Sequence, residues 1–233
     1  MNTQIDLLKK VYKEQLGITF NHTTAHNRWV VNKDWGGSQV GDNGQYFWPM
    51  KEALHVGDYR NLNIYFRHIP DYTDFGGHGS NPQYEAWKNI PIRDRTLRDG
   101  AVISDFTLPG STHKWMNKGH TALHEVGHWF GLYHPFQDDQ TRRDNQNPDP
   151  CHPLDPDDHV TDTPKMQATA GMSGTCNENA DTCPNAPGKD PVHNFMAYSI
   201  DSCLTEFTAG QAARVRMIWA TYRANATSNT WRD

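Results

Sequence analysis

The sequence predicts an α+β fold, in which a regular half built of helices and strands is followed by an irregular half. Within residues 1–134, apolar side chains recur at helical spacing, and short apolar runs rich in β-branched and aromatic residues indicate strands. From residue 135 to Phe195, Asp, Asn, Pro and Gly dominate the chain. We therefore expect a single domain over residues 1–233, divided into an N-terminal subdomain (1–134) and a C-terminal subdomain (135–233).

The expected elements begin with a helix at the N-terminus. Apolar residues follow a helical spacing over Ile5–Leu16, and Gly17 is placed to end that helix. Residues Asp74–Arg98 are rich in Gly, Pro, Asn and charge without a lasting period, so we expect a loop insertion near the cleft. The other expected elements are strands at Ile18–Phe20, Arg28–Val31, Leu62–Phe66 and Ala101–Thr107, a brief helix at Pro49–His55, and a terminal helix at Ala209–Arg223.

The most informative stretch reads His-Glu-Val-Gly-His-Trp-Phe-Gly-Leu-Tyr-His and spans His124 to His134. On a helix, His124 and His128 lie about one turn apart on the same face, with Glu125 beside them. A straight helix would carry His134 roughly 9 Å further along the axis, so the chain must turn back. Gly131 permits that turn, because glycine accepts a positive φ at little steric cost. Three imidazoles and one carboxylate in this pattern predict a zinc site.

The third ligand could in principle come from elsewhere, since some zinc enzymes take a Glu from a later helix. Only Glu178 and Glu206 follow His128, and neither lies in an acidic helical motif. His134 is therefore the better third ligand. Three neutral imidazoles leave Zn²⁺ an open position for a water molecule whose pKa falls to around 7. With Glu125 as general base and acid, that zinc-bound water would hydrolyse peptide bonds, so we expect a zinc-dependent endopeptidase.

The four cysteines, Cys151, Cys176, Cys183 and Cys203, all lie in the last third of the chain. Their even number favours two disulfides, which imply an oxidising compartment and hence secretion. A second zinc site is the alternative, but the gaps of 25, 7 and 20 residues lack short Cys-x-x-Cys pairs. Spacing alone allows three disulfide pairings.

Composition and charge bear on the partners. The net charge of −5, with scattered basic residues, provides no broad basic face, so nucleic acid is not an expected partner. No apolar run approaches the roughly 18 residues of a membrane span, and residues 1–20 lack the apolar block of a signal peptide. The start fits either a mature domain without its leader or a cytosolic protein. We expect a monomer that acts on protein or peptide substrates, with no nucleic acid and no membrane.

An acidic segment follows the zinc motif. Eight Asp lie between Asp138 and Asp162, opposed only by Arg142 and Arg143. Such hard oxygen ligands suit Ca²⁺, whereas the alternative is a solvated acidic loop.

The zinc motif resembles that of the metzincin metallopeptidases, and the similarity is strongest to their pappalysin branch. Further matching segments are Asp162-Thr163-Pro164, Asn194-Phe195-Met196, Ser202-Cys203 and Phe207-Thr208, and the likeness covers roughly Leu62–Arg223. It is closest to the smaller secreted fungal and bacterial members. The resemblance implies a zincin whose N-terminal subdomain holds a twisted, mainly parallel sheet with backing and active-site helices. It also implies an irregular C-terminal subdomain with disulfides and a terminal helix.

The resemblance also assigns residues. It implies that Met196 forms a methionine turn beneath the metal. Tyr198, two residues later, could donate a hydrogen bond to the developing oxyanion, and the alternative is that its ring packs against the core. The resemblance implies the disulfides Cys151–Cys183 and Cys176–Cys203, and calcium ligation in which Asp158 and Thr163 take part.

Two departures from relatives concern specificity. Ala197 stands where relatives have Asp, and Ser202 stands where basic-specific members have an acid, although Asp201 is near enough to give some preference for Arg or Lys. No cysteine precedes Cys151 to cap the zinc from an inhibitory prosegment, so we expect the active form. The strand Ala101–Thr107 is expected to offer its edge to an extended substrate.

Two other functions fit the same motif. One is a binding or toxin-like module that keeps zinc without general turnover, and the other is an enzyme restricted to one partner protein. An intact Glu125 argues against the first, because a protein without catalysis needs no base.

Overall fold

The computed structural model describes residues 2–22, 24–33, 35, 47–68, 76–136, 151, 158–167 and 176–226. The helices and strands are α1 (Asn2–Val11), α2 (Trp48–Leu54), β1 (Ile64–Arg67), β2 (Gly77–Gly79), α3 (Pro82–Trp87), α4 (Ile92–Leu97), β3 (Ala101–Ser104), α5 (His120–Trp129) and α6 (Ala209–Ile218). Turns of π-helix at Tyr12–Leu16 and Trp219–Arg223 extend α1 and α6, and short 3-10 turns cover Thr24–His26 and Asp105–Thr107.

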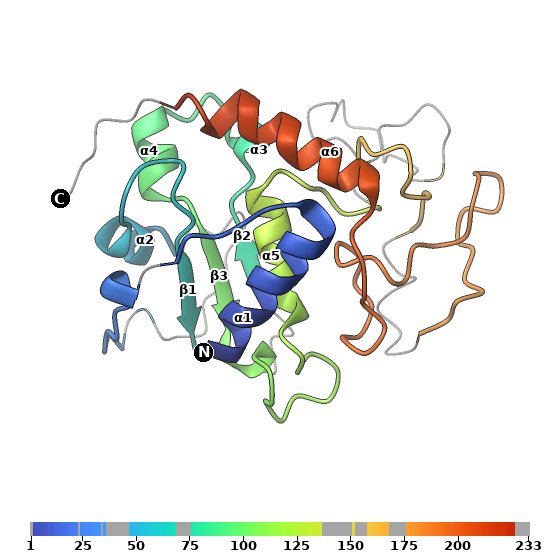
Figure 1. Ribbon diagram of the computed structural model, residues 1–233, viewed down its shortest axis with the longest axis horizontal. Coiled ribbons are helices and arrows are strands. Elements are labelled where there is room, and N and C mark those ends of the chain that lie inside the picture. Colours follow the sequence, from blue (N-terminus) through green and yellow to red (C-terminus); the bar gives the residue numbers. More distant parts are fainter. Residues whose placement is uncertain are drawn as a thin grey trace.

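A three-stranded sheet in the order β1-β3-β2 forms the centre of the fold (Figure 1). Strand β1 runs parallel to β3, and β2 runs antiparallel to β3. Alternate residues face opposite sides, so Ala101 and Ile103 pack with α1 and α5, whereas Tyr65 and Val102 pack with Phe47 and Met50 at α2. The α+β prediction is confirmed, with a small mixed sheet between helical layers.

The predicted N-terminal helix is confirmed. It runs through α1 and the following π-helical turn, and Gly17 ends it with a φ of 71°. Fully buried Tyr12 donates a hydrogen bond from its hydroxyl to the Leu123 carbonyl at 2.8 Å, and Gln4 Nε2 donates to the Gly119 carbonyl at 3.0 Å. This helix therefore packs against α5 and is hydrogen-bonded to it at two places.

The prediction of a loop insertion over Asp74–Arg98 is wrong for the described residues 76–98, which contain β2, α3 and α4. The Asn81 side chain accepts hydrogen bonds from the Gln83 and Tyr84 amides and so begins α3, with Pro82 in its first turn. Three to six residues are too few to show a period, which explains the missed elements.

Two predicted strands are absent from the described residues. Ile18–Phe20 and Arg28–Val31 are irregular, and the Phe20 ring packs edge-on against Tyr12 with 5.3 Å between centroids. Strand β3 ends at Ser104, where a 3-10 turn begins, so Ala101–Thr107 is only partly a strand. Because β3 lies between β1 and β2, it offers no free edge to a substrate, and that prediction is also wrong.

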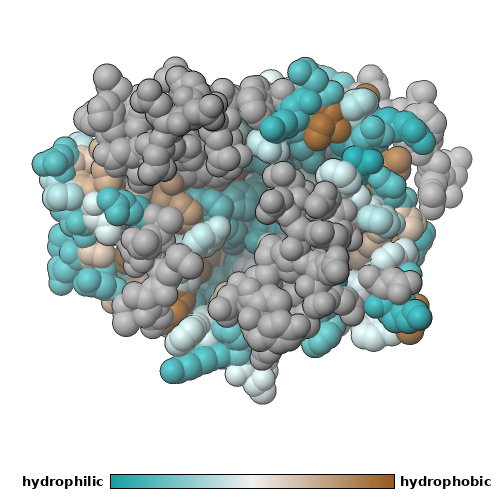
Figure 2. Space-filling model, turned by 180° about the vertical axis from the view of Figure 1, so that it is seen from behind, coloured by the Kyte–Doolittle hydropathy of each residue, from teal (hydrophilic) through white to brown (hydrophobic). Residues whose placement is uncertain are grey.

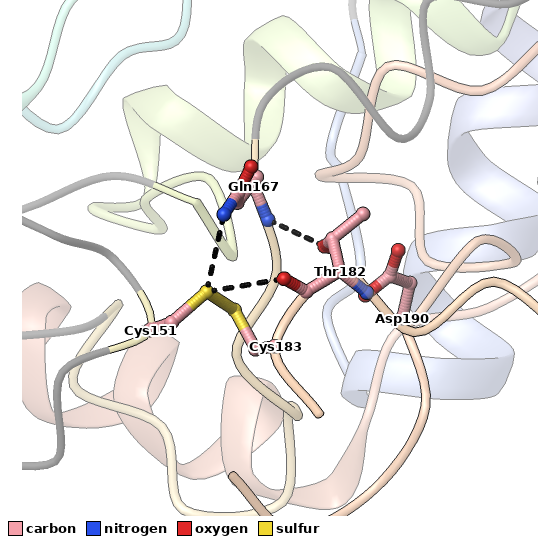
Figure 3. The surroundings of a disulfide bond; sticks show 5 residues. All are labelled: Cys151, Gln167, Thr182, Cys183 and Asp190. Atoms are coloured by element: carbon pink, nitrogen blue, oxygen red, sulfur yellow. Dashed lines mark hydrogen bonds between the residues drawn. A yellow bond between two sulfur atoms is a disulfide. The ribbon is translucent and has the colours of Figure 1, made fainter. Parts of the chain in front are cut away.

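Two disulfides organise the C-terminal half. Cys151 is bonded to Cys183 and Cys176 to Cys203, the pairing that the resemblance implies. Since all four sulfurs are used, the alternative of a second zinc site on the cysteines is wrong. Around the first bond, Gln167 and Thr182 converge on Cys151 (Figure 3).

On the side opposite to Figure 1, hydrophilic residues line a hollow near the middle of the molecule (Figure 2). Among the described residues, no helix is both long and apolar enough to span a membrane.

Candidate active site

Helix α5, which carries the zinc motif, begins without a side-chain cap of its own. Gly119 occupies the N-cap position with a φ of 82°. The carboxylate of Asp201, which is 3% exposed, accepts hydrogen bonds from the Lys118 amide at 2.7 Å and from the His120 amide. A negative charge at the N-terminus of a helix also interacts favourably with the helix dipole. Asp201 is thus engaged with the start of α5, which argues against the substrate preference considered for it.

The end of α5 forms a Schellman motif around Gly131, whose φ is 87°. The Leu132 amide donates to the Gly127 carbonyl at 3.0 Å, and the Gly131 amide donates to the His128 carbonyl at 2.8 Å. A Cβ at residue 131 would lie 2.5 Å from Ile218 Cγ2, so glycine is required both by φ and by space. This turn brings Tyr133 and His134 back beside the helix.

The structure brings His124, His128 and His134 together. Their Nε2 atoms form a triangle with sides of 3.0, 3.0 and 3.1 Å. His124 Nδ1 lies 2.8 Å from the Phe195 carbonyl, and His128 Nδ1 lies 2.8 Å from the Leu132 carbonyl. Because each of these carbonyls needs a donor, the proton sits on Nδ1 and the Nε2 lone pair faces inward.

This arrangement fits a metal ion. Inward lone pairs at about 3 Å repel one another unless a cation lies between them, and imidazole nitrogens are zinc ligands. Burial lowers the pKa of His124 to about 3, with a smaller lowering by His128, and burial lowers the pKa of His128 to about 4. The hydrogen bonds to the two carbonyls oppose these shifts only in part, so both rings are neutral and able to ligate. Within the described part of the chain, this is the triad of histidines that could hold zinc.

Glu125 lies on the same helix and is 7% exposed. Burial raises the pKa of its carboxyl group to about 8, opposed by a hydrogen bond from the Gly79 amide and by the charge of Lys51. A bound divalent cation would lower this pKa, because positive charge favours the carboxylate. A carboxyl group poised in this range can both accept and return a proton.

Strand β2 lies directly against α5 at two glycines. A Cβ on Gly77 would be 2.7 Å from Glu125 Cγ, and a Cβ on Gly79 would be 2.1 Å from the Glu125 carbonyl oxygen. The absence of side chains lets the strand reach the helix and place its Gly79 amide on the Glu125 carboxylate.

Met196 is fully buried beneath α5, and its Sδ would lie 2.5 Å from a Cβ at Gly127. The turn is held by Asn194, whose Oδ1 accepts from the Met196 amide at 2.9 Å. Asn194 also exchanges two hydrogen bonds of 2.9 Å with Gln211 of α6. Met196 therefore lies in a turn beneath α5 that is tied to the C-terminal helix, and its role as a methionine turn under the metal stays a prediction.

Tyr198 borders the histidines and is 44% exposed. Its ring lies 4.8 Å from the His134 ring and 5.7 Å from the His124 ring, centroid to centroid. Although the side chain is partly exposed, its partial loss of hydration and the charge of Glu125 raise the pKa of Tyr198 to about 12, so its hydroxyl keeps its proton at neutral pH. Phe136 stacks on His134 at 4.7 Å and 8°, and contacts Tyr198 at 4.7 Å.

The residues predicted for calcium lie in the segment 158–167, in which Asp162 accepts hydrogen bonds from Thr208 and Gly210 at the start of α6. Asp158 is 1% exposed and Thr163 is 6% exposed. Thr163 Oγ1 lies 2.8 and 2.7 Å from the two Asp158 carboxylate oxygens and 3.0 Å from the Val160 carbonyl. Most of the acidic segment between Asp138 and Asp162 lies outside the described residues.

Several residues that shape this site were not predicted. They are Gly77 and Gly79 of β2, Phe136, Asp201 at the start of α5, and Arg214, Ile218 and Arg223 after the methionine turn. The Gly-His-Gly sequence of β2 was a usable signal, because alternating glycines in an extended segment indicate close approach of another backbone. Phe136 contacts His134 two residues before it and Tyr198 far from it, and the remaining residues act through contacts distant in sequence, which leave no local pattern.

Comparison with known proteins places this site in a family. The family described as pregnancy-associated plasma protein-A matches residues 106–220. An extracellular metalloprotease of Podospora anserina is 38% identical over 226 residues, which cover 97% of this chain and 67% of that protein. One of Neurospora crassa is 36% identical over 228 residues, with 97% and 68% covered.

Solved structures also match the fold of this chain. Mature mirolysin of Tannerella forsythia, in complex with a cleaved peptide, matches with a TM-score of 0.51 and 30% identity over 69% of this chain and 53% of that one. This chain thus spans about half of the mirolysin chain. The fold and the histidine site together define a metzincin metalloprotease. The chain belongs to the pappalysin family, so the resemblance seen in the sequence is confirmed.

Proposed function

We propose that this chain is an extracellular zinc endopeptidase, in which His124, His128 and His134 hold the metal. The observation that carries the proposal is the triangle of inward-facing Nε2 atoms, with Glu125 adjacent on the same helix. When bound, zinc would supply a Lewis acid that activates water and polarises the scissile carbonyl. The names of the fungal relatives support an extracellular location, as do the two disulfides.

The roles of the protein residues follow from their positions. Glu125 would take a proton from the attacking water and return it to the leaving amine. The neutral Tyr198 hydroxyl would donate a hydrogen bond to the oxygen of the scissile carbonyl as it gains charge. Met196 would support the histidines from below. We further propose that residues 1–134 and 135–233 act as two subdomains of one catalytic domain.

Strand β2 is the better candidate for binding an extended substrate. It is an edge of the described sheet, and it lies against α5 beside Glu125. Apart from the Gly79 amide that bonds Glu125, the backbone groups on its outer side could pair with a peptide strand, which favours polypeptide substrates cut within the chain. The expectation of a monomer that works without nucleic acid or a membrane stays a prediction from the sequence.

The experiment that tests this function is cleavage of a proteome-derived peptide library, with the cut sites identified by mass spectrometry. We expect cuts by the zinc-loaded protein, none after the zinc is removed, and their return when zinc is restored. Assays on several unrelated intact proteins would separate a general endopeptidase from an enzyme of one partner. Absence of cutting by a protein that binds zinc stoichiometrically would support the binding module instead.

Replacing Tyr198 with phenylalanine is expected to lower kcat by about 10²-fold with little change in KM, because one donor to the oxyanion is lost while the ring packing stays. Steady-state kinetics on one peptide substrate would measure this split. Tyr222→Phe, on the turn after α6, is the control and should match the unmodified protein. An unchanged kcat for Tyr198→Phe would leave this tyrosine with a packing role alone.

We also propose that Asp158 and Thr163 help to bind a structural calcium ion. The Thr163 hydroxyl lies within 3.0 Å of both carboxylate oxygens of buried Asp158 and of the Val160 carbonyl, and the Val160 amide donates to the same carboxylate. A carboxylate, a hydroxyl and a carbonyl brought together are the kinds of oxygen ligand that a hard cation takes. The resemblance to the pappalysins supports the same residues.

Adding Ca²⁺ to calcium-free protein at fixed Zn²⁺ is therefore expected to raise Tm by about 5–10 °C, as saturating binding adds about 2.7 kcal/mol at a hundredfold excess over Kd. Asp158→Asn should remove this response. Asp190→Asn is a matched control, because buried Asp190 also accepts from a threonine hydroxyl, that of Thr182 at 2.8 Å. It should lower Tm yet keep the calcium response. A native Tm insensitive to Ca²⁺ would rule the site out.

A further inference from the structure

The C-terminal helix α6 contacts the turn that delivers the third zinc ligand. The turn runs from Trp129 to His134 and must hold a tight reversal, because His134 has no helix of its own to fix it. Helix α6 crosses at this end of α5 (Figure 1). Any movement of the turn would therefore shift the His134 ring.

Arg214 of α6 forms a hydrogen bond to the middle of this turn. Its Nε donates to the Gly131 carbonyl at 2.9 Å, and its Nη2 donates to the Gln83 side chain of α3 at 2.7 Å. Its guanidinium also lies 4.9 Å from the Tyr133 ring centroid. The side chain is 5% exposed, so these contacts are shielded from water. Arg214 therefore holds the reversal at Gly131 through the carbonyl of that residue, and it holds Tyr133, two residues later, through the aromatic ring.

Two more residues of the same C-terminal segment contact the turn. Ile218 fills the space next to the Gly131 Cα, where no Cβ could fit. Arg223 donates from Nε to the Trp129 carbonyl at 3.1 Å and lies over the Trp129 ring at 3.8 Å. Arg223 is also paired with fully buried Asp99, so its removal would leave an uncompensated buried charge and affect the whole fold.

We propose that Arg214 is a positioning residue for the zinc site, which acts through the Gly131 turn to hold His134 in place. Carbonyls that are not bonded within a helix end need other donors, and Arg214 supplies one at the residue where the chain reverses. Partners of this kind that orient a metal ligand typically change metal affinity by about 10–100-fold when lost. This inference rests on the proposed zinc site, and it adds a role for a residue 80 positions beyond His134.

The test is the rate at which zinc leaves the folded protein for a coloured competing chelator, measured well below Tm. Arg214→Met keeps much of the side-chain volume but removes the donors, and it should release zinc about tenfold faster or more. Arg214→Lys keeps the charge without the planar fork and should fall between. Arg216→Met and Arg216→Lys, on the same helix at an exposed position, should match the unmodified protein.

A second control separates positioning from general loss of stability. Met50→Ala removes core volume from a residue that is 5% exposed and belongs to the separate apolar cluster with Phe47, Tyr65 and Val102, which contains no residue of the turn. It should lower Tm yet leave zinc release within about twofold of normal. Equal release from the Arg214 and Arg216 variants, or equal acceleration by Met50→Ala, would overturn the proposal. If Arg214→Met does not fold, the comparison of zinc release from Arg214→Lys and Arg216→Lys decides. If the unmodified protein binds no zinc, it is the proposed function that fails.

Discussion

Replacing Glu125 with glutamine is expected to reduce peptide hydrolysis by about 10³-fold or more while the protein still binds one zinc ion. Glutamine keeps the size of the side chain and an oxygen that can accept from the Gly79 amide, so the packing against β2 is preserved. It cannot take a proton from the attacking water. The loss should appear in kcat, because the group acts on the reacting atoms rather than in holding the substrate.

The measurement is kcat and KM on one cleaved peptide, together with the zinc content of the purified protein. Glu206→Gln, an exposed glutamate at the approach to α6, is the control and should keep both activity and zinc. Two results would contradict the role of Glu125. One is activity within tenfold of normal, and the other is an equal loss in the zinc content, which would make Glu125 part of metal retention.

The proposed zinc ligands could be predicted from the sequence because their geometry is local. Helical spacing alone places His124 and His128 on one face, and one glycine with a positive φ accounts for the return of His134. The backing helix could be predicted for the same reason, since ten or more residues give a clear period. A site formed by one helix and the turn after it therefore leaves a recognisable pattern in the sequence.

The environment of the site could not be predicted, because it is made by residues far apart in the sequence. Asp201 reaches the start of α5 from beyond the methionine turn, and Arg214 reaches its end from the C-terminal helix. The substrate edge was assigned to the strand Ala101–Thr107, because its apolar run is the clearest before the zinc helix. That run is apolar because β3 is central and buried on both faces. The edge proposed for the substrate, β2, has three residues, two of which are glycine.

Replacing Gly79 with alanine is expected to damage the site without changing a ligand or the base. The added Cβ would lie 2.1 Å from the Glu125 carbonyl oxygen and 2.9 Å from His128 Cβ. One of these obstacles is helix backbone, which cannot rotate away, so β2 must move off α5. Overpacking of this kind costs about 1–3 kcal/mol of folding stability. We expect activity to fall further than stability, because the moved strand carries both the amide that bonds Glu125 and the proposed substrate edge.

Gly76→Ala is the matched control, because it adds the same atom just before the same strand. There the nearest atom is Thr121 Cγ2, at 3.0 Å, which belongs to a side chain that can shift. Chemical denaturation would give the stability of both variants, and peptide kinetics would give kcat and KM. The physical argument requires a larger stability loss and a higher KM for Gly79→Ala than for Gly76→Ala. Equal behaviour of the two would mean that the close packing of β2 on the zinc helix has no part in catalysis. A kcat loss for Gly79→Ala with unchanged KM would keep the effect on Glu125 but remove β2 as the substrate edge.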